Sequence, residues 1–500
     1  MRGLTFDRAR WLVSAVAGLA LPLAFAPFNW FFIAPLSYAA LFYAWRDARP
    51  KHAFWIGLVY GCTSFGAGTY WTYIAVHDFG ELPVPLAVVI SLALVATLAL
   101  FVAVTGFIAA RWFRTGGAGA WLVSLPALFV LAEWTRGWLF TGFGWLAAGY
   151  SQTDSWLIGW APLFGVHAMS WAVLLAAGGL LTLWRGTPRA RLAAAVAIVG
   201  LAIVGLASGN RDWTAPKDRV LGVAVVQGAI TQDLKWRPEQ LPETLRVYEE
   251  LTAQSAGSDL IVWPEAAIPD LYERMTGYLD SLRTWAIERG SVIVLGILAT
   301  GPDGGTSTFR NVVVSLTEPP AMYVKRHLVP FGEYYPVPEF MRDWFRLMNL
   351  PASDAVPGAA DQPPLEIAGE KVAVTICYED VFGAEQLHYL PEATLLVNVS
   401  NDAWFGDSIA PHQHLQIARV RAAEAGRYLL RSTNTGVSAV IDPRGALVAT
   451  LPQFEPGVLK APVRGYTGAT PYARWGNYPV VIGALLALAA ALWPSSRRRS

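Results

Sequence analysis

The sequence predicts two structural classes in one chain: a polytopic bundle of α-helices that crosses a membrane about eight times, and a layered α/β domain. Three observations predict this. Hydrophobic residues make up 54% of the 500 residues and charged residues only 15%, whereas soluble proteins contain about 25% charged residues. Apolar residues form long runs before position 210 and again near the end. Between them, short β-rich runs alternate with helical stretches.

The apolar runs are each about 20 residues long, which is enough to cross roughly 30 Å of hydrocarbon. No small-residue cleavage site follows the first run, so we predict a retained span rather than a signal peptide. We expect a seven-span bundle over 1–212, an α/β domain over 213–472, and a final span with a basic tail over 473–500. The runs begin near Trp11, Trp30, Phe54, Leu86, Trp121, Trp156, Leu192 and Tyr478.

Basic residues are distributed unevenly among the predicted loops. If the N-terminus is cytoplasmic, nearly all of them fall in inner loops, as the positive-inside rule requires. Both termini are then cytoplasmic, and the α/β domain lies on the periplasmic side of a bacterial inner membrane. The net charge of +1 gives no indication of nucleic-acid binding. The inner basic residues are Arg2, Arg8, Arg10, Arg46, Arg49, Lys51, Arg111, Arg114, Arg185, Arg189, Arg191, Arg497, Arg498 and Arg499.

The middle segment has the alternation that is typical of a layered α/β fold with a buried sheet. Helices are expected over 239–256 and 414–427. The β-rich runs are 220–226, 260–263, 292–298, 311–316, 372–376 and 395–399.

The two cysteines are expected in different parts of the chain, Cys62 in a span and Cys377 in the α/β domain. A lone thiol is usually buried and inert. However, Cys377 directly follows a β-run, and Glu265 and Lys325 follow two others. Side chains at strand ends stand exposed where loops converge, so the three residues predict a reaction centre.

Three motifs around these residues are similar to motifs of the nitrilase superfamily: Trp-Pro-Glu-Ala-Ala-Ile-Pro (263–269), Tyr-Val-Lys-Arg-His-Leu-Val-Pro-Phe-Gly-Glu (323–333) and Ile-Cys-Tyr-Glu-Asp (376–380). Within it, the chain resembles the apolipoprotein N-acyltransferase family, also over 135–152 and 398–406. The resemblance implies an αββα sandwich. It also implies transfer of a fatty acyl chain from a phospholipid, through a cysteine thioester, to the N-terminal α-amine of a diacylglyceryl-cysteine lipoprotein, without a cofactor or metal.

The residue types indicate how the centre would work. Cys377 is the expected nucleophile, and Glu265 is the expected general base. Lys325 can stabilise both the thiolate and the oxyanion of a tetrahedral intermediate. The amide N–H of Tyr378, directly after the nucleophile, is a second expected donor to that oxyanion.

Two further acids have supporting roles by resemblance. Glu333 is expected to support Lys325 and Glu265. Glu379 is expected to be a further supporting carboxylate that contacts the reacting groups' neighbours and not the substrate. Taken alone, each of these acids is an ordinary surface charge.

Five residues are expected to contact substrate by the same resemblance. Arg136 would bind a phospholipid phosphate, and Trp138 and Trp145 would line the path of the acyl chain. Trp236 would lie near the active site, and Trp404 would lie in a loop over it. Each has an ordinary alternative: an arginine that snorkels, tryptophans of an aromatic belt, or tryptophans packed in a core.

Three functions are compatible with these patterns. The first is N-acyltransfer by a monomer, with a membrane phospholipid as donor and a diacylated apolipoprotein as acceptor. The second is a membrane-anchored amidase or nitrilase, which would use the same residues to hydrolyse a small amide or nitrile. The third is a transporter or scaffold without enzymatic activity. The long apolar bundle argues against the second, and the strand-end residues argue against the third. His412 and His414 are too few ligands for a metal site.

Overall fold

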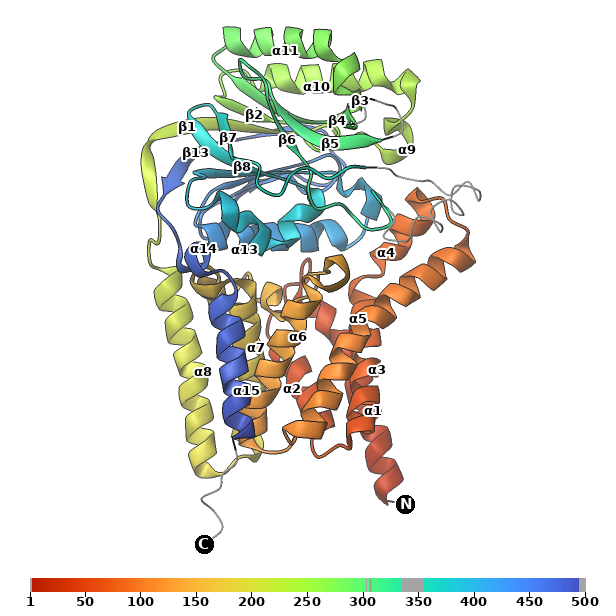
Figure 1. The fold of residues 1–500 in the computed structure, drawn as a ribbon, viewed down its shortest axis with the longest axis vertical. Helices are drawn as coiled ribbons and strands as arrows, with labels where there is room; N and C mark the ends of the chain where they lie inside the picture. The colour runs from red at the N-terminus through yellow and green to blue at the C-terminus, as the bar shows by residue number, and fades with distance from the viewer. Residues whose placement is uncertain (1, 303, 305–307, 335–354, 494–500) are drawn as a thin grey trace. The chain divides into compact units, whose positions relative to one another are not determined.

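The computed structural model describes residues 2–302, 304, 308–334 and 355–493. The chain divides into two compact units (Figure 1). One, the helical unit, comprises Met1–Arg211 together with Trp475–Ser500. The other, the α/β unit, comprises Asp212–Arg474. The predicted basic tail, Arg497, Arg498 and Arg499, lies outside the described residues.

The helical unit is built from the predicted apolar runs. Pro50 and Pro188 lie in the first turns of their helices, where the missing backbone N–H costs no hydrogen bond. The helices are α1 (Arg2–Ala20), α2 (Ile33–Trp45), α3 (Pro50–Gly68), α4 (Trp71–Ile74), α5 (Val84–Trp112), α6 (Leu125–Arg136), α7 (Ala161–Arg185), α8 (Pro188–Gly209) and α15 (Tyr478–Leu492). α14 (Pro471–Trp475) lies at the boundary of the two units.

Three helical segments in the described part of the chain are long and apolar enough to cross a membrane: Val84–Trp112, Trp156–Arg185 and Pro188–Gly209. The apolar helices Ile33–Trp45 and Tyr478–Leu492 are shorter. Membrane-spanning helices are therefore supported, while the predicted total of about eight spans stays a prediction.

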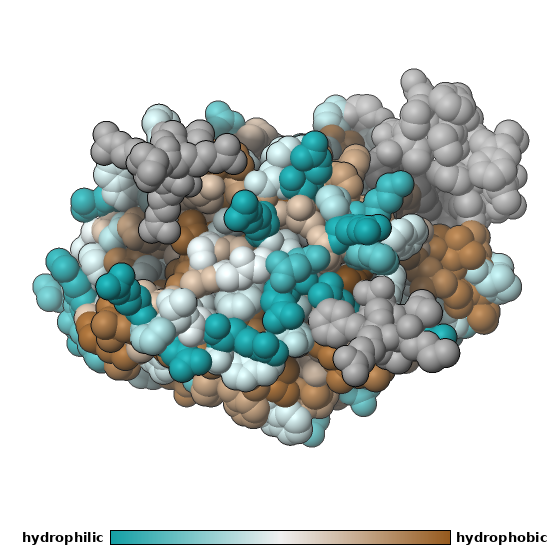
Figure 2. Space-filling model, turned by 90° about the horizontal axis from the view of Figure 1, so that it is seen from below, coloured by the Kyte–Doolittle hydropathy of each residue, from teal (hydrophilic) through white to brown (hydrophobic). Residues whose placement is uncertain are grey.

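The surface of the helical unit carries apolar stripes. On α8, Leu192, Val196, Val199 and Ile203 follow one another at helical spacing and are each more than half exposed. Exposure of such an apolar stripe to water is unfavourable, whereas contact with the acyl chains of lipids is favourable. Seen from below, the unit shows hydrophilic residues across its end and hydrophobic residues toward the rim (Figure 2).

Basic loops of the helical unit meet at one end. The Arg185 Nη2 atom donates to the Tyr43 hydroxyl at 3.2 Å, which brings the end of α7 to the end of α2. The Asp47 carboxylate lies against Gly116, which brings the loop after α5 to the loop after α2. The charges of three loops therefore share one end of the unit.

Close packing of α3 on α5 depends on glycine. A Cβ atom at Gly61 would lie 2.6 Å from the Cα atom of Ala99. Small residues at such contacts let two helix backbones approach closely. On the same helix, a Cβ atom at Gly66 would have its nearest neighbour at 4.0 Å.

The α/β unit contains two sheets. Among the described residues, the first has the order β13-β1-β2-β4-β5-β6, with β3 also paired to β4, and the second has the order β12-β11-β10-β9-β8-β7. The central pairs β1–β2, β2–β4, β8–β9 and β9–β10 are parallel. The strands are β1 (Ala215–Gln227), β2 (Leu260–Val262), β3 (Ile268–Leu271), β4 (Val292–Thr300), β5 (Phe309–Ser315), β6 (Ala321–Val324), β7 (Leu365–Ile367), β8 (Glu370–Ile376), β9 (Leu395–Ser400), β10 (Leu429–Thr433), β11 (Ala439–Ile441), β12 (Leu447–Thr450) and β13 (Gly457–Thr467).

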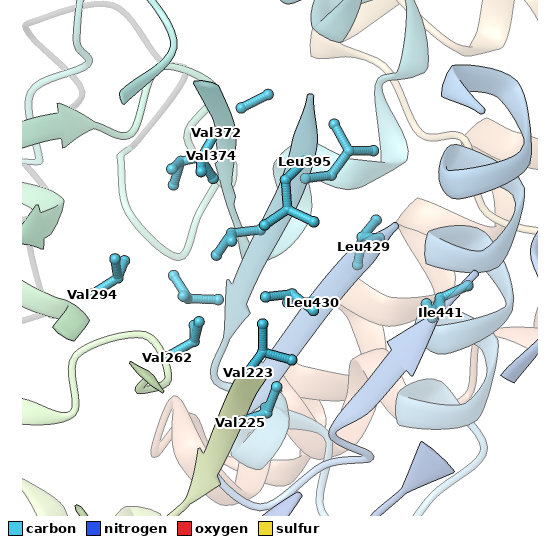
Figure 3. Close-up of a cluster of buried hydrophobic side chains, with 14 of the residues drawn as sticks. Val223, Val225, Val262, Val294, Val372, Val374, Leu395, Leu429, Leu430 and Ile441 are labelled. Carbon is cyan, nitrogen blue, oxygen red and sulfur yellow. The ribbon is translucent and has the colours of Figure 1, made fainter. Parts of the chain in front are cut away.

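The two sheets pack face to face with helices outside them. Val223, Val262 and Val294 of the first sheet meet Val374 and Leu430 of the second in one buried core (Figure 3). A second core lies between the first sheet and helices α10 (Leu241–Gln254) and α11 (Thr276–Glu288). Helix α13 (Ala410–Ala425) packs against the second sheet, and the short α9 (Gln232–Lys235) follows β1. The expected αββα sandwich is confirmed.

We predict that Gly61→Ala destabilises the helical unit, because the new methyl group collides with the α5 backbone at a cost of about 1–3 kcal/mol. The thermal unfolding temperature of the purified protein should fall. Gly66→Ala is the matched control and should leave it unchanged or raise it, because alanine favours helix. Equal effects of the two substitutions would contradict the close packing described for Gly61.

Candidate active site

Three strand ends supply the central residues of the site. Glu265 follows β2 by three positions, and Lys325 and Cys377 directly follow β6 and β8. Glu265 can lie close to β4 because Gly296 has no side chain: a Cβ atom there would lie 2.6 Å from the Glu265 Cα atom. The three side chains are at most 9% exposed.

The Lys325 ammonium lies between two carboxylates. Its Nζ atom is 2.8 Å from Glu333 Oε1 and 3.3 Å from Glu265 Oε1. Burial by itself lowers the pKa of Lys325, but the charges of Glu333 and Glu265 outweigh it and raise that pKa above its usual range. The side chain is therefore a permanent cation, suited to stabilise an oxyanion.

The Cys377 thiol is held in an unusual backbone conformation. Cys377 has φ +52°, in the left-handed region that is costly for residues with a side chain. Burial raises the pKa of its thiol, the Glu265 charge raises it further, and the Lys325 charge lowers it, with a net rise. The resting thiol is therefore protonated, and its attack requires a base. The Glu265 carboxylate is the nearby charge that can accept the proton, so the group can carry out acyl transfer through a thioester.

Glu379 connects the strand end of Lys325 to that of Cys377. Its carboxylate accepts from the backbone N–H groups of Ile376 at 2.7 Å, Arg326 at 2.8 Å and His327 at 3.1 Å. The Tyr323 hydroxyl also donates to it at 3.0 Å. The predicted supporting carboxylate thus couples the end of β6 to the turn Cys377–Val381, the nucleophile turn.

Three residues that the sequence analysis did not single out hold Glu265. The Asn311 Nδ2 atom donates to Glu265 Oε1 at 2.7 Å, and the Asn401 backbone N–H donates to Oε2 at 2.8 Å. The buried Lys235 ammonium donates to the Glu265 carbonyl at 3.2 Å. Burial lowers the pKa of Lys235 to about 8, although the Glu265 charge opposes the shift. Asn311 is a polar residue within a buried β-run, which is the one signal that could have identified it.

Asn311 also connects the two acids. Its Nδ2 atom lies 3.3 Å from Glu333 Oε1, so one amide contacts both carboxylates that hold Lys325. Glu333 Oε2 accepts from the Val329 backbone N–H at 2.8 Å. Glu333 therefore lies in the cluster, as the resemblance implies, while its role in the reaction stays a prediction.

Of the remaining predicted site residues of the α/β unit, Tyr378 is partly buried and the two tryptophans are exposed. Tyr378 follows the thiol in the turn Cys377–Val381, and its ring packs edge-on against Phe382 with centroids 5.0 Å apart. Trp236 follows α9 and is 45% exposed, and Trp404 is 40% exposed within Asp402–Phe405. Their proposed contacts with substrate stay predictions.

The other predicted substrate contacts belong to the helical unit. Arg136 is buried, and its Nη1 atom donates to the carbonyls of Phe143 at 2.7 Å and Trp145 at 2.6 Å. Trp145 is buried, with its ring centroid 5.3 Å from that of Trp71, whereas Trp138 is exposed. Arg136 thus holds the turn that carries Trp145. The proposed phosphate and acyl contacts of these residues stay predictions.

The raised pKa of Cys377 leads to a prediction for alkylation. In Cys62→Ala protein, which keeps one thiol, reaction of Cys377 with iodoacetamide should be slow at neutral pH and should still be rising above the ordinary thiol pKa of about 8.5, because the raised pKa leaves little thiolate below it and only the thiolate reacts. Mass spectrometry of the labelled peptide measures the rate, with Cys62→Ala/Cys377→Ala as the control. A rate that is constant from about pH 6 to about pH 8 would indicate a resident thiolate and contradict this account.

Comparisons with known proteins identify two related families. The Apolipoprotein N-acyltransferase N-terminal domain family matches residues 17–179, and the Carbon-nitrogen hydrolase family matches residues 222–472. A solved amidase of the nitrilase superfamily from Nesterenkonia AN1 is 22% identical, with a TM-score of 0.38, over 52% of this chain and 95% of that chain.

Several relatives are similar over nearly the whole chain. The apolipoprotein N-acyltransferase of Methylococcus capsulatus is 41% identical and covers 94% of this chain and 93% of the relative. That of Azotobacter vinelandii is 42% identical and covers 100% and 98%. That of Nitrosomonas europaea is 44% identical and covers 98% of each. The chain belongs to the apolipoprotein N-acyltransferase family.

Proposed function

We propose that this chain transfers a fatty acyl chain from a membrane phospholipid to the N-terminal α-amine of a diacylglyceryl-cysteine lipoprotein. The observation that carries the proposal is the meeting of Cys377, Glu265 and Lys325 in a chain that belongs to this family along nearly its whole length. Every step is a substitution at an acyl carbon, so the reaction as proposed needs no cofactor or metal.

In the first half-reaction, the Cys377 sulfur attacks the ester carbonyl carbon while its proton passes to Glu265. The resulting oxyanion is stabilised by the Lys325 ammonium and by the backbone N–H of Tyr378. Collapse of the intermediate breaks the carbon–oxygen ester bond, and Glu265 returns the proton to the departing alkoxide. The products are a lysophospholipid and an acyl thioester on Cys377.

In the second half-reaction, the neutral α-amine of the lipoprotein attacks the thioester carbonyl carbon. The same two donors stabilise the oxyanion, and the carbon–sulfur bond breaks. Glu265 accepts the amine proton and restores the thiol. Because the acceptor is an amine and not water, exclusion of water from the thioester decides between transfer and hydrolysis.

The membrane arrangement is also proposed. Both substrates carry acyl chains that lie in the bilayer, and the apolar surface of α8 and three long apolar helices support a membrane location. We infer about eight spans within 1–212 and 473–500. The basic loops that share one end support cytoplasmic termini and a periplasmic catalytic domain, 213–472, in a bacterial inner membrane. One chain supplies all the reacting groups, so a monomer suffices.

Substrate contacts complete the proposal. Trp236 and Trp404 offer exposed apolar rings on the α/β unit. Arg136, Trp138 and Trp145 are proposed to bind the phospholipid phosphate and the acyl chain.

Mass spectrometry tests the proposal. The purified protein, incubated with a phospholipid of one defined acyl chain, should gain the mass of that acyl group on the peptide that contains Cys377. Cys377→Ala should gain none. Glu265→Gln should form the adduct at least about 100-fold more slowly, since general base catalysis is worth about 10²–10⁴-fold. Glu273→Gln, an acid of the same unit bonded to Thr300, is the matched control and should react at the native rate.

Addition of a diacylated lipopeptide should then remove the adduct and give N-acylated peptide. A native protein that never gains the adduct from varied phospholipids would refute the proposal. Hydrolysis of small amides by the same preparation would instead favour the amidase function.

A further inference from the structure

A buried ring of charges lies behind the nucleophile turn. The His414 Nδ1 atom is 2.8 Å from Asp402 Oδ1, and its Nε2 atom is 2.8 Å from Asp380 Oδ1. Arg431 closes the ring, with Nη1 3.2 Å from Asp380 Oδ2 and Nη2 2.9 Å from Asp402 Oδ2. All four side chains have 0% exposure. Two carboxylates thus alternate with two basic side chains.

The geometry determines the protonation state of His414. A neutral imidazole donates from one nitrogen only, but here both nitrogens face a carboxylate oxygen. The imidazolium donates to both. Burial and the Arg431 charge lower the pKa of His414, but the charges of Asp380 and Asp402 outweigh them and raise it to about 9. Loss of the proton would leave a nitrogen lone pair against a buried carboxylate.

The ring of charges joins two segments that carry the reacting groups. Asp380 lies in the turn that begins at Cys377, and the His414 Nε2 atom is also 3.3 Å from the Cys377 carbonyl oxygen. Asp402 directly follows Asn401, whose backbone N–H donates to Glu265. The imidazolium, together with Arg431, therefore bridges the nucleophile turn and the segment that orients the base.

We propose that His414, as an imidazolium, is a positioning residue that aligns the nucleophile turn of Cys377 with the segment that orients Glu265. This inference rests on the proposed roles of those two residues. The groups that face the His414 imidazole are Asp380, Asp402, the Cys377 carbonyl and, through the two carboxylates, Arg431. Asp402 of the ring of charges also acts on the thiol, because its charge raises the pKa of Cys377. Loss of the His414 imidazolium should slow the chemical step without weakening phospholipid binding, because the imidazolium supports the reacting groups from behind the turn.

The test compares His414→Asn with His412→Asn in the full-length protein. His412 lies on the same helix but bonds to Gln453, outside the ring of charges. The initial rate of thioester formation is measured against phospholipid concentration. His414→Asn should lower the maximal rate about 10- to 100-fold, the effect expected of misaligned reacting groups. The half-saturating phospholipid concentration should stay native, and His412→Asn should be native in both.

A pH series tests whether His414 carries a positive charge in the folded protein. The folded-state pKa of His414 lies above its ordinary value, so the stability that its charge contributes is complete below about pH 6.5 and is lost as pH rises through about 9. The difference in unfolding temperature between native protein and His414→Asn should therefore shrink over this range. In native protein with ¹³C-labelled histidine, one of the seven histidine resonances should keep its imidazolium position at pH 8.

Three results would overturn the inference. The first is a folded His414→Asn protein with the native maximal rate, and the second is a slower reaction that a rise in the half-saturating phospholipid concentration explains. The third is the absence of an imidazolium resonance at pH 8. If His414→Asn does not fold, Asp402→Asn replaces it, and a native maximal rate there would also overturn the inference. Failure of the proposed function is distinguishable, because native protein would then form no thioester while the histidine resonance still reported the imidazolium.

Discussion

The site depends on one buried cation, the ammonium of Lys325 between Glu265 and Glu333. A buried ammonium without partners costs several kcal/mol, and removing one partner of a buried pair leaves an uncompensated charge. Two carboxylates around one ammonium are more than charge balance needs. The buried Lys235, which contacts the Glu265 carbonyl, supplies the second positive charge. Burial, together with the charge of the Glu265 carboxylate, keeps the Cys377 thiol protonated, although the Lys325 charge opposes this. Base-assisted attack, rather than a resident thiolate, is a consequence.

The sandwich positions this cluster because each reacting side chain lies just beyond the end of a strand. Lys325 directly follows β6 of the first sheet and Cys377 directly follows β8 of the second, so the site needs contacts that cross between sheets. Glu379 supplies one by accepting from backbone N–H groups on both sides. The ring of charges around His414 supplies the other support, from the outer helix α13. Alignment of thiol and base is thus set by buried polar contacts around the apolar core.

The sequence was sufficient to predict the two structural classes, the sandwich and the residues at strand ends. Hydropathy and the motifs at strand ends can be read from short stretches of sequence. Cys377, Glu265 and Lys325 each lie in such a motif. Contacts between distant segments have no local signal: Asn401 and Glu265 are 136 positions apart and still share a hydrogen bond. The sequence assigns His414 no role, because its carboxylate partners, Asp380 and Asp402, become its neighbours only in the folded chain.

The span count shows the same limit in the helical unit. Hydropathy marks an apolar run near Trp121, and the structure begins it with a π-helical turn, Ala120–Ser124, that leads directly into the α-helix Leu125–Arg136. Hydropathy does not register such local changes of helix type, so it predicts that a run is apolar and long enough to span but not its helical geometry.

The central claim is that one ammonium serves both halves of the reaction, since the oxyanion forms at the same place in each. Single-turnover rates of thioester formation and of acyl transfer from thioester to lipopeptide, measured separately in Lys325→Met and in native protein, test it most directly. The account predicts that both rates fall by about 100-fold or more. A variant that is slow in one half-reaction and native in the other would contradict a shared oxyanion site.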